Sequence, residues 1–230
     1  LVNQDRNVFA ACMVAAGHAD GMVTGVTRNY ATALEDILRV IDPARNEKPM
    51  GMSIVLSRGR TLFIADTAVS EFPDAPELAR IVMQTAAMVR QFGAVPRVAL
   101  VSASTFGNPK MERSEKIREA VSILDRREDT DFEYDGEMSV DVALDPNIRE
   151  LYPFTRLSEP ANALVMPAIH SASISTSLLA AAGGATVVGP ILSGLAQPIQ
   201  IAPLGAAVSD IVSFATLAAF QAAEQDGAKD

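Results

Sequence analysis

The sequence contains few of the residues that form disulfides or bind metals. Cys12 is its only cysteine, so no internal disulfide can form, and a reducing compartment is the expected setting. The chain has two histidines, and neither an H-E-x-x-H motif nor a paired-cysteine motif offers a zinc site. We therefore expect the chain to be cytoplasmic and to hold no metal.

Basic residues are also scarce. The 19 Lys and Arg are outnumbered by 28 Asp and Glu, which gives a formal net charge of −9. Such a chain has no broad basic surface for nucleic-acid phosphates, so we expect no nucleic-acid partner. The 230 residues are 49% hydrophobic and 20% charged, which is typical of a soluble globular protein of one large or two small domains. Residues 1–6 lack the basic-then-apolar order of a signal peptide.

Residues 160–209 contain no Asp, Glu, Lys or Arg. A membrane-spanning helix needs about 20 consecutive apolar residues, and Gly and Pro interrupt every segment of this stretch. The interrupting residues are Pro167, Gly183, Gly184, Gly189, Pro190, Gly194, Pro198 and Pro203. The stretch therefore predicts a buried α/β core and no membrane partner.

The common nucleotide-binding motifs are absent as well. No G-x-x-x-x-G-K-[ST] sequence provides a P-loop, and no G-x-G-x-x-G follows a predicted strand. The chain thus lacks the usual fingerprint of a nicotinamide cofactor site.

Short β-rich runs alternate with longer helical runs. The predicted strands are residues 19–25, 52–56, 61–65, 97–102, 162–166 and 186–188. The predicted helices are residues 8–16, 31–40, 75–92, 112–126, 171–182 and 206–224, and the end of the chain from residue 224 is expected to fray. This alternation predicts an α/β fold, with a mostly parallel sheet covered by helices on both faces. Residues 52–56 and 61–65 are close enough to form one antiparallel hairpin.

Some polar residues have plausible local roles. Asp74 is a predicted helix N-cap, and so is Ser171 or Ser173, because their oxygens can accept first-turn amide hydrogens. The acidic cluster at residues 127–145 is interpreted as a solvated loop and helix start. A metal site is less favoured there because no His, Cys or calcium-loop spacing accompanies the carboxylates.

The strongest local pattern for a ligand site is V-A-L-V-S-A-S-T-F-G-N-P at residues 98–109. An apolar strand here ends in hydroxyl and glycine residues, which would expose backbone amides to a phosphate or carbonyl oxygen. The alternative is an ordinary turn. His18 is interpreted as a loop residue. His170, at a strand-to-helix junction, is interpreted as either a ligand contact or a helix cap.

The order and spacing of several segments resemble phosphotransacetylases across nearly the whole chain. These segments are residues 19–25, 63–66, 102–107, 135–137, 162–167 and 189–198. Residues 27–30, 104–107 and 170–176 make the chain most similar to the phosphotransacetylase-like C-terminal domain of bacterial hybrid NADP-dependent malic enzymes, in the phosphate acetyl/butyryl transferase family.

The resemblance implies a fold of two three-layer αβα lobes of the isocitrate dehydrogenase-like type. Residues 1–50 and 198–230 would belong to the first lobe, which would be incomplete at its N-terminus, and residues 51–197 would form the second. It also implies a homodimer or higher homo-oligomer.

The sequence departs from the active family at charged positions. The family's Ser-Arg-Gly is Pro203-Leu204-Gly205 here, and the lysine of S-T-K-G-S is Phe106. A further family arginine aligns with Glu35. Asp210 alone matches the family's catalytic set, and we interpret it as the N-cap of the last helix, so no catalytic residue is expected.

The resemblance therefore implies a regulatory domain that binds acetyl-CoA as an inhibitor of a malic enzyme. The parent would convert malate to pyruvate with NADP and Mg or Mn, all bound outside this chain, by a dehydrogenase domain in the same polypeptide. The expected acyl-CoA contacts are Arg28, Ser104, Thr105, Phe106, Gly107, Asn108, His170 and Ser173.

Two alternatives remain open. One is a working phosphate acetyltransferase that uses Arg28, Arg58 or Arg60 in place of the missing cation. The other is a structural module that dimerises the parent through the apolar last helix and binds nothing. The apolar residues of that helix are Ile211, Phe214, Leu217 and Phe220.

Overall fold

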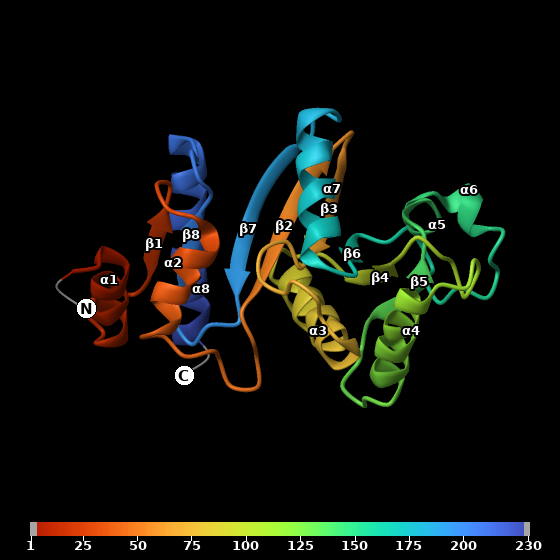
Figure 1. Cartoon of the computed structure of the whole chain (residues 1–230), viewed down its shortest axis with the longest axis horizontal. Coiled ribbons are helices and arrows are strands. Elements are labelled where there is room, and N and C mark those ends of the chain that lie inside the picture. The colour runs from red at the N-terminus through yellow and green to blue at the C-terminus, as the bar shows by residue number, and fades with distance from the viewer. Residues whose placement is uncertain (1–3, 228–230) are drawn as a thin grey trace. The chain divides into compact units, whose positions relative to one another are not determined.

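The computed structural model describes residues 4–227 and divides into two compact units. The first unit comprises residues 1–51 and 188–230, and the second comprises residues 52–187. Figure 1 shows the elements of both units along the chain. The sequence predicted lobes of residues 1–50 with 198–230 and of residues 51–197, the first of them incomplete at its N-terminus. These lobe assignments remain predictions.

The larger sheet has six strands. Their order is β5 (Glu133–Met138), β4 (Arg97–Val101), β6 (Ala163–Val165), β3 (Arg60–Ala65), β2 (Met50–Ser57) and β7 (Thr186–Ser193). The β3–β6, β6–β4 and β4–β5 pairs are parallel, whereas β2 and β3 form an antiparallel hairpin. The predicted sheet, mostly parallel with one antiparallel hairpin, is therefore confirmed.

The parallel strands β3, β4 and β6 are largely apolar because helices cover both of their faces. Ile64, Ala99 and Leu164 pack on one face with Val142 of α5 (Val140–Leu144) and Ala172 of α7 (Ile169–Ala181). Alternate residues of these strands point to the opposite face, because successive side chains of a strand alternate. The helices α3 (Ala75–Gln91) and α4 (Glu112–Asp125) contact each other and, like α5 and α7, contact strands of this sheet.

Helix α3 begins as the sequence predicts. The Asp74 carboxylate accepts a hydrogen bond of 2.8 Å from the Glu77 amide, so Asp74 is the N-cap. At the other end, the Phe92 ring lies 5.8 Å from the Phe63 ring of β3. Asp74 thus fixes the start of α3, and Phe92 packs its end against β3.

The first unit contains a two-stranded parallel sheet and three helices. Strands β1 (Met22–Gly25) and β8 (Ile199–Ala202) pair over their full length. The helices are α1 (Arg6–Ala15), α2 (Tyr30–Leu38) and α8 (Val208–Gly227). Gly25 lies at φ +109°, and a Cβ atom there would sit 2.1 Å from the Ala202 carbonyl oxygen. Glycine is therefore required where these two strands meet.

The interpretation of residues 127–145 as a solvated loop and helix start holds for the mostly exposed residues 127–132 and for the start of α5, but it is wrong for the middle of the cluster. Part of it forms strand β5, in which Asp135 and Glu137 are buried. Asp135 is accommodated because it accepts hydrogen bonds of 2.8 Å from the Thr155 hydroxyl and the Arg156 amide. Strand β8 and the short helix α6 (Pro146–Arg149) were also not predicted.

Two predicted N-caps are wrong. Helix α7 begins after Ala168, and Ser171 donates its hydroxyl to the Ala168 carbonyl instead of capping the helix. Asp210 lies inside the first turn of α8, where its carboxylate reaches back to the Ala207 amide at 2.8 Å.

The expected fraying from residue 224 is not seen as far as Gly227, where α8 ends, and residues 228–230 lie outside the described part. Across residues 4–227, the structure contains no helix with the length and apolar character of a membrane span.

Candidate functional site

The parallel strands of the second unit end at one edge, where ligands commonly bind in α/β proteins. Residues 66–74 follow β3, residues 102–111 follow β4, and residues 166–168 follow β6. The first turns of α4 provide three further polar side chains to this edge: Ser114, Lys116 and Arg118. Most of the residues predicted to contact a ligand lie on these segments.

A cluster of serine hydroxyls opens the loop after β4. Ser104 is fully buried, and its Oγ atom lies 2.7 Å from Ser114 Oγ. Ser102 Oγ lies 2.8 Å from the same Ser114 atom. The cluster joins the loop to helix α4, so Ser104 is part of the loop's internal support.

Glu137 is the charged residue at the centre of this support. Its side chain has no exposed surface, and one oxygen, Oε1, accepts three hydrogen bonds. The donors are the Ser104 hydroxyl at 2.9 Å, the Gly107 amide at 2.8 Å and the Arg118 guanidinium at 2.8 Å. The other oxygen, Oε2, has no hydrogen-bond partner within the described part of the chain.

The backbone amides of residues 105–108 all donate hydrogen bonds to other groups of the chain. The amides of Thr105 and Asn108 donate to each other's carbonyl oxygens at 2.9 and 3.0 Å. The Phe106 amide donates to the Glu137 carbonyl at 2.8 Å, and the Gly107 amide donates to the Glu137 side chain. The expectation that these amides are free for a phosphate oxygen is therefore wrong.

The Phe106 ring packs into an aromatic cluster. Its centroid lies 5.7 Å from the ring of Tyr152 and 4.9 Å from that of Phe154. Thr105 forms hydrogen bonds of 3.0 Å with Ser139, at the start of α5. The loop therefore contacts two neighbouring segments, while Asn108 remains exposed.

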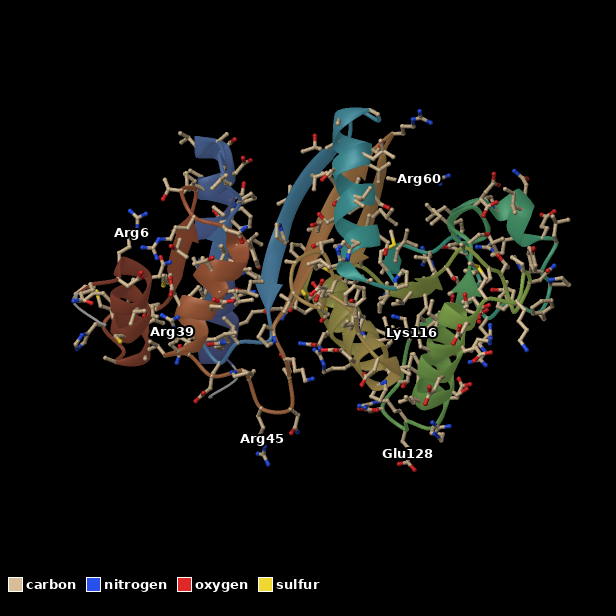
Figure 2. All side chains as sticks on the ribbon, viewed as in Figure 1. Arg6, Arg39, Arg45, Arg60, Lys116 and Glu128 are labelled. Atoms are coloured by element: carbon tan, nitrogen blue, oxygen red, sulfur yellow. The ribbon has the colours of Figure 1, made fainter. Side chains whose placement is uncertain are left out.

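Lys116 connects the two other loops of this edge. Its ammonium group donates to the carbonyl oxygens of Pro73 at 3.0 Å and Pro167 at 2.9 Å. Figure 2 shows Lys116 projecting from α4. A single helix turn thus holds the segments that follow β3 and β6.

The predicted residues on α7 are accessible. His170 is exposed, and its ring stacks on Phe72 with centroids 5.6 Å apart. It lies in the first turn of α7 and is not the N-cap, because Ala168 has that position. Ser173 lies one turn further along the helix and is exposed too.

Arg28 belongs to the first unit and is paired with carboxylates there. Its guanidinium lies 2.6 Å from Asp5 Oδ2 and 3.0 Å from Asp36 Oδ2. The hydrogen bond from Arg28 lowers the pKa of Asp5, and the same bond raises the pKa of Arg28. This arginine is therefore already neutralised by its neighbours.

Two of the positions that depart from active phosphotransacetylases, Leu204 and Glu35, are exposed in the first unit. Leu204 is 71% exposed, and Glu35 is exposed on α2. An aliphatic side chain and a carboxylate at these positions cannot stabilise a phosphate.

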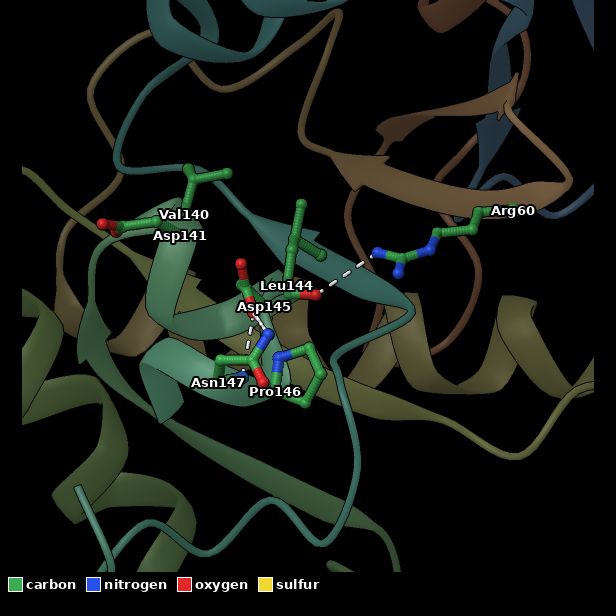
Figure 3. A pocket seen from close by; sticks show the side chains of 7 residues that line it. All are labelled: Arg60, Val140, Asp141, Leu144, Asp145, Pro146 and Asn147. Carbon is green, nitrogen blue, oxygen red and sulfur yellow. Dashed lines mark hydrogen bonds between the residues drawn. The ribbon is translucent and has the colours of Figure 1, made fainter. Parts of the chain in front are cut away.

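A separate groove of about 780 Å³ lies beside α5 in the second unit (Figure 3). Arg60 donates to the Leu144 carbonyl at 3.3 Å across it. The lining residues are Arg60, Val140, Asp141, Leu144, Asp145, Pro146 and Asn147, and no predicted acyl-CoA contact is among them. Among the side chains that the structure describes, no group of three or more His, Cys, Asp or Glu could hold a metal ion.

Four of the side chains that build this edge were not predicted from the sequence. They are Ser114, Lys116, Arg118 and Glu137. Glu137 was noticed only as part of the Asp-Gly-Glu segment, because its partners lie up to 33 residues away in the chain. Hydrogen bonds between residues so far apart in the chain produce no local sequence pattern.

Comparison with known proteins relates this architecture to a family. The family described as Phosphate acetyl/butaryl transferase matches residues 1–219. The NADP-dependent malic enzyme of Rhizobium meliloti (strain 1021) is 58% identical over 222 residues, which cover 96% of this chain and 29% of that protein. The phosphate acetyltransferase of Bacillus subtilis (strain 168) is 31% identical over 220 residues, which cover 95% of this chain and 68% of that protein.

A solved structure has the same fold. The crystal structure of a phosphotransacetylase from Streptococcus pyogenes matches with a TM-score of 0.89 and 31% identity, covering 95% of this chain and 67% of the other. The chain spans less than a third of the malic enzyme's length. The predicted α/β fold of the phosphotransacetylase type is confirmed, and the chain belongs to the phosphate acetyl/butaryl transferase family.

Proposed function

We propose that this chain is a regulatory acyl-CoA-binding part of a malic enzyme and has no transacetylase activity of its own. The NADP-dependent malic enzyme of Rhizobium meliloti is 58% identical to it and extends well beyond it. The proposed parent carries a dehydrogenase domain in the same polypeptide, which binds NADP and Mg or Mn and converts malate to pyruvate.

The observation that carries the proposal is the side chain at position 204. The resemblance places an arginine of active phosphotransacetylases there, and this chain has an exposed Leu204. Acyl and phosphoryl transfer depend on groups that stabilise developing charge, and the loss of one such donor costs about 3–4 kcal/mol. Phe106 and Glu35 replace two further cations, so the combined loss abolishes transfer.

Two of the three arginines that could substitute are already engaged. Arg28 is paired with two carboxylates, and Arg60 donates to a backbone carbonyl. Arg58 lies in the tight turn of the β2–β3 hairpin at φ +50°. The contacts of Arg28 and Arg60 favour the regulatory function over an active acetyltransferase.

Binding of a coenzyme requires less than catalysis does. A ligand site needs convergent polar groups and apolar walls, without stabilisation of a transition state. Asn108, His170 and Ser173 are the exposed members of the proposed contact set. Ser104, Thr105, Phe106 and Gly107 shape the loop that carries Asn108, and Arg28 remains a proposed contact within the first unit.

Oligomerisation is the second proposed role. Val208, Val212 and Phe220 of α8 are 78%, 59% and 46% exposed, which is a large apolar area for one helix. Phe214, which the sequence also suggested for an interface, is instead buried in the first unit. We propose a homodimer in which exposed residues of α8 are covered.

The experiment that tests regulation uses the complete polypeptide. Malate oxidation is measured with increasing acetyl-CoA, with free CoA as the matched control, and transacetylase activity is assayed on the same sample. We expect acetyl-CoA to inhibit malate oxidation, because a ligand that favours one conformation shifts the population. We also expect no acetyl-CoA to form from acetyl phosphate and CoA. Unchanged malate oxidation would contradict regulation, and measurable transacetylation would contradict the loss of catalysis.

A further inference from the structure

Glu137 has a function that neither the family resemblance nor the proposed regulation assigns. It is a carboxylate without exposed surface on strand β5, and burial of such a charge is costly unless several donors satisfy it. Its donors come from two segments, the loop after β4 and helix α4. All three donors reach the same oxygen, Oε1, whereas Oε2 has no hydrogen-bond partner in the described part of the chain.

The loop that Glu137 holds has an uncommon backbone conformation. Phe106 and Gly107 lie at φ +47° and +88°, in the left-handed region, which a bulky residue such as Phe seldom adopts. The amides of both residues donate to Glu137, one to its carbonyl oxygen and one to its carboxylate. The strained turn is thus fixed by one residue at two points.

The donors around Glu137 Oε1 form a set suited to an anion. A hydroxyl, a backbone amide and a guanidinium converge on this one oxygen, at 2.8 to 2.9 Å. These are the groups that bind phosphate oxygens in other proteins. Because the chain's own carboxylate already occupies the position, a phosphate of a ligand cannot use it.

We propose that Glu137 is a positioning residue that acts as a built-in anion: it fixes the loop at residues 102–109 and leaves that loop to recognise an uncharged part of the acyl-CoA, either the acyl group or an amide of its arm. The identity of the ligand rests on the proposed function. The fixing of the loop by Glu137 does not.

The test combines hydrogen exchange with ligand binding in the full-length protein. Exchange of the peptide covering residues 102–109 is measured by mass spectrometry without ligand, and acetyl-CoA affinity is measured by calorimetry. In Glu137→Ala, we expect loop exchange to rise and affinity to fall, each by roughly tenfold or more. Glu137→Gln keeps a carbonyl acceptor for Ser104 and Gly107. We therefore expect its loop exchange and its acetyl-CoA affinity to lie closer to those of the unaltered protein than in Glu137→Ala.

Asp135→Ala is the matched control. Asp135 is a buried carboxylate on the same strand, but it holds Thr155 and Arg156 instead. We expect faster exchange around residues 155–156 in this variant and unchanged exchange at residues 102–109. An equal effect of both variants on residues 102–109 would overturn the positioning role, because it would reflect general destabilisation.

The remaining outcomes also decide the proposal. Unchanged loop exchange in a folded Glu137→Ala protein would overturn it. If that variant does not fold, Glu137→Gln and Ser104→Ala decide, and exchange in both that matches the unaltered protein would overturn it. If loop exchange rises as expected but the unaltered protein does not bind acetyl-CoA, the positioning role stands and the proposed function fails.

Discussion

At the residue scale, the contacts of the predicted ligand residues differ from what their types suggest. Gly107 and Ser104 were expected to face a ligand, and both donate to Glu137 instead. Arg28 was expected as a ligand cation and is paired with Asp5 and Asp36. The residue type predicts which hydrogen bonds and ion pairs a side chain can form. The neighbours in the fold decide whether those bonds are already formed within the chain.

The Asp5–Arg28 pair makes stability depend on pH. The hydrogen bond from Arg28 lowers the pKa of Asp5 below its ordinary value of 3.8. A carboxyl whose folded pKa is lowered stabilises the fold above its unfolded pKa, and that contribution is lost as the pH falls through the folded pKa. We expect Asp5→Asn to reduce the free energy of unfolding at neutral pH and to have progressively less effect below pH 3.8.

Urea unfolding at several pH values measures this effect. In an Arg28→Met background, Asp5→Asn should cost less, because the two residues are in contact and their effects are coupled. A cost of Asp5→Asn that stays constant from neutral pH to well below pH 3.8 would contradict the assignment.

At the element scale, the sequence predicted the strongly patterned segments. The hairpin of β2 and β3 and the helix α3 follow local rules, namely two β-rich runs joined by Arg58-Gly59 and an Asp74 cap. Strand β5 was missed because Glu133, Asp135 and Glu137 give it the composition of a solvated loop. It forms a strand because its two buried carboxylates find donors in distant segments, which the sequence does not display.

Strand β1 provides a test of one close approach. Gly25→Ala would place a Cβ atom 2.1 Å from the Ala202 carbonyl oxygen of the paired strand, at φ +109°. We expect a loss of about 3 kcal/mol or more in the free energy of unfolding, because backbone atoms must move. Denaturant titration followed by circular dichroism measures it.

Gly17→Ala is the control for Gly25→Ala. Gly17 also has a positive φ, +72°, but a Cβ atom there would meet nothing within 4 Å. Its cost should be about 1–2 kcal/mol, the strain of a left-handed residue alone. Equal losses in the two variants would show that backbone strain, and not the approach of β8, determines the requirement for Gly25.

At the scale of the whole molecule, the order of the segments predicted the family. The Gly and Pro residues at 189–198 and the hydroxyl-rich loop at 102–107 keep the spacing of phosphotransacetylases, and residues 1–219 match the family. The support of the site could not be predicted in the same way. Glu137, Arg118 and Lys116 act through contacts that exist only after folding.

The proposed loss of catalysis rests on the missing charge at positions 106 and 204. Leu204 and Phe106 cannot stabilise a transferring phosphate, whereas the loop and α7 still offer exposed polar side chains such as Asn108 and His170. A chain of this kind is expected to bind an acyl-CoA without converting it.

The most direct measurement is a calorimetric titration of acetyl-CoA into the full-length protein, with free CoA as the control. We predict saturable binding. Acetyl-CoA should bind more tightly than CoA if the loop fixed by Glu137 recognises the acyl group, and about equally if it recognises an amide of the arm, which CoA also carries. No saturable binding to a folded sample would contradict the central claim and leave oligomerisation as the role of the chain.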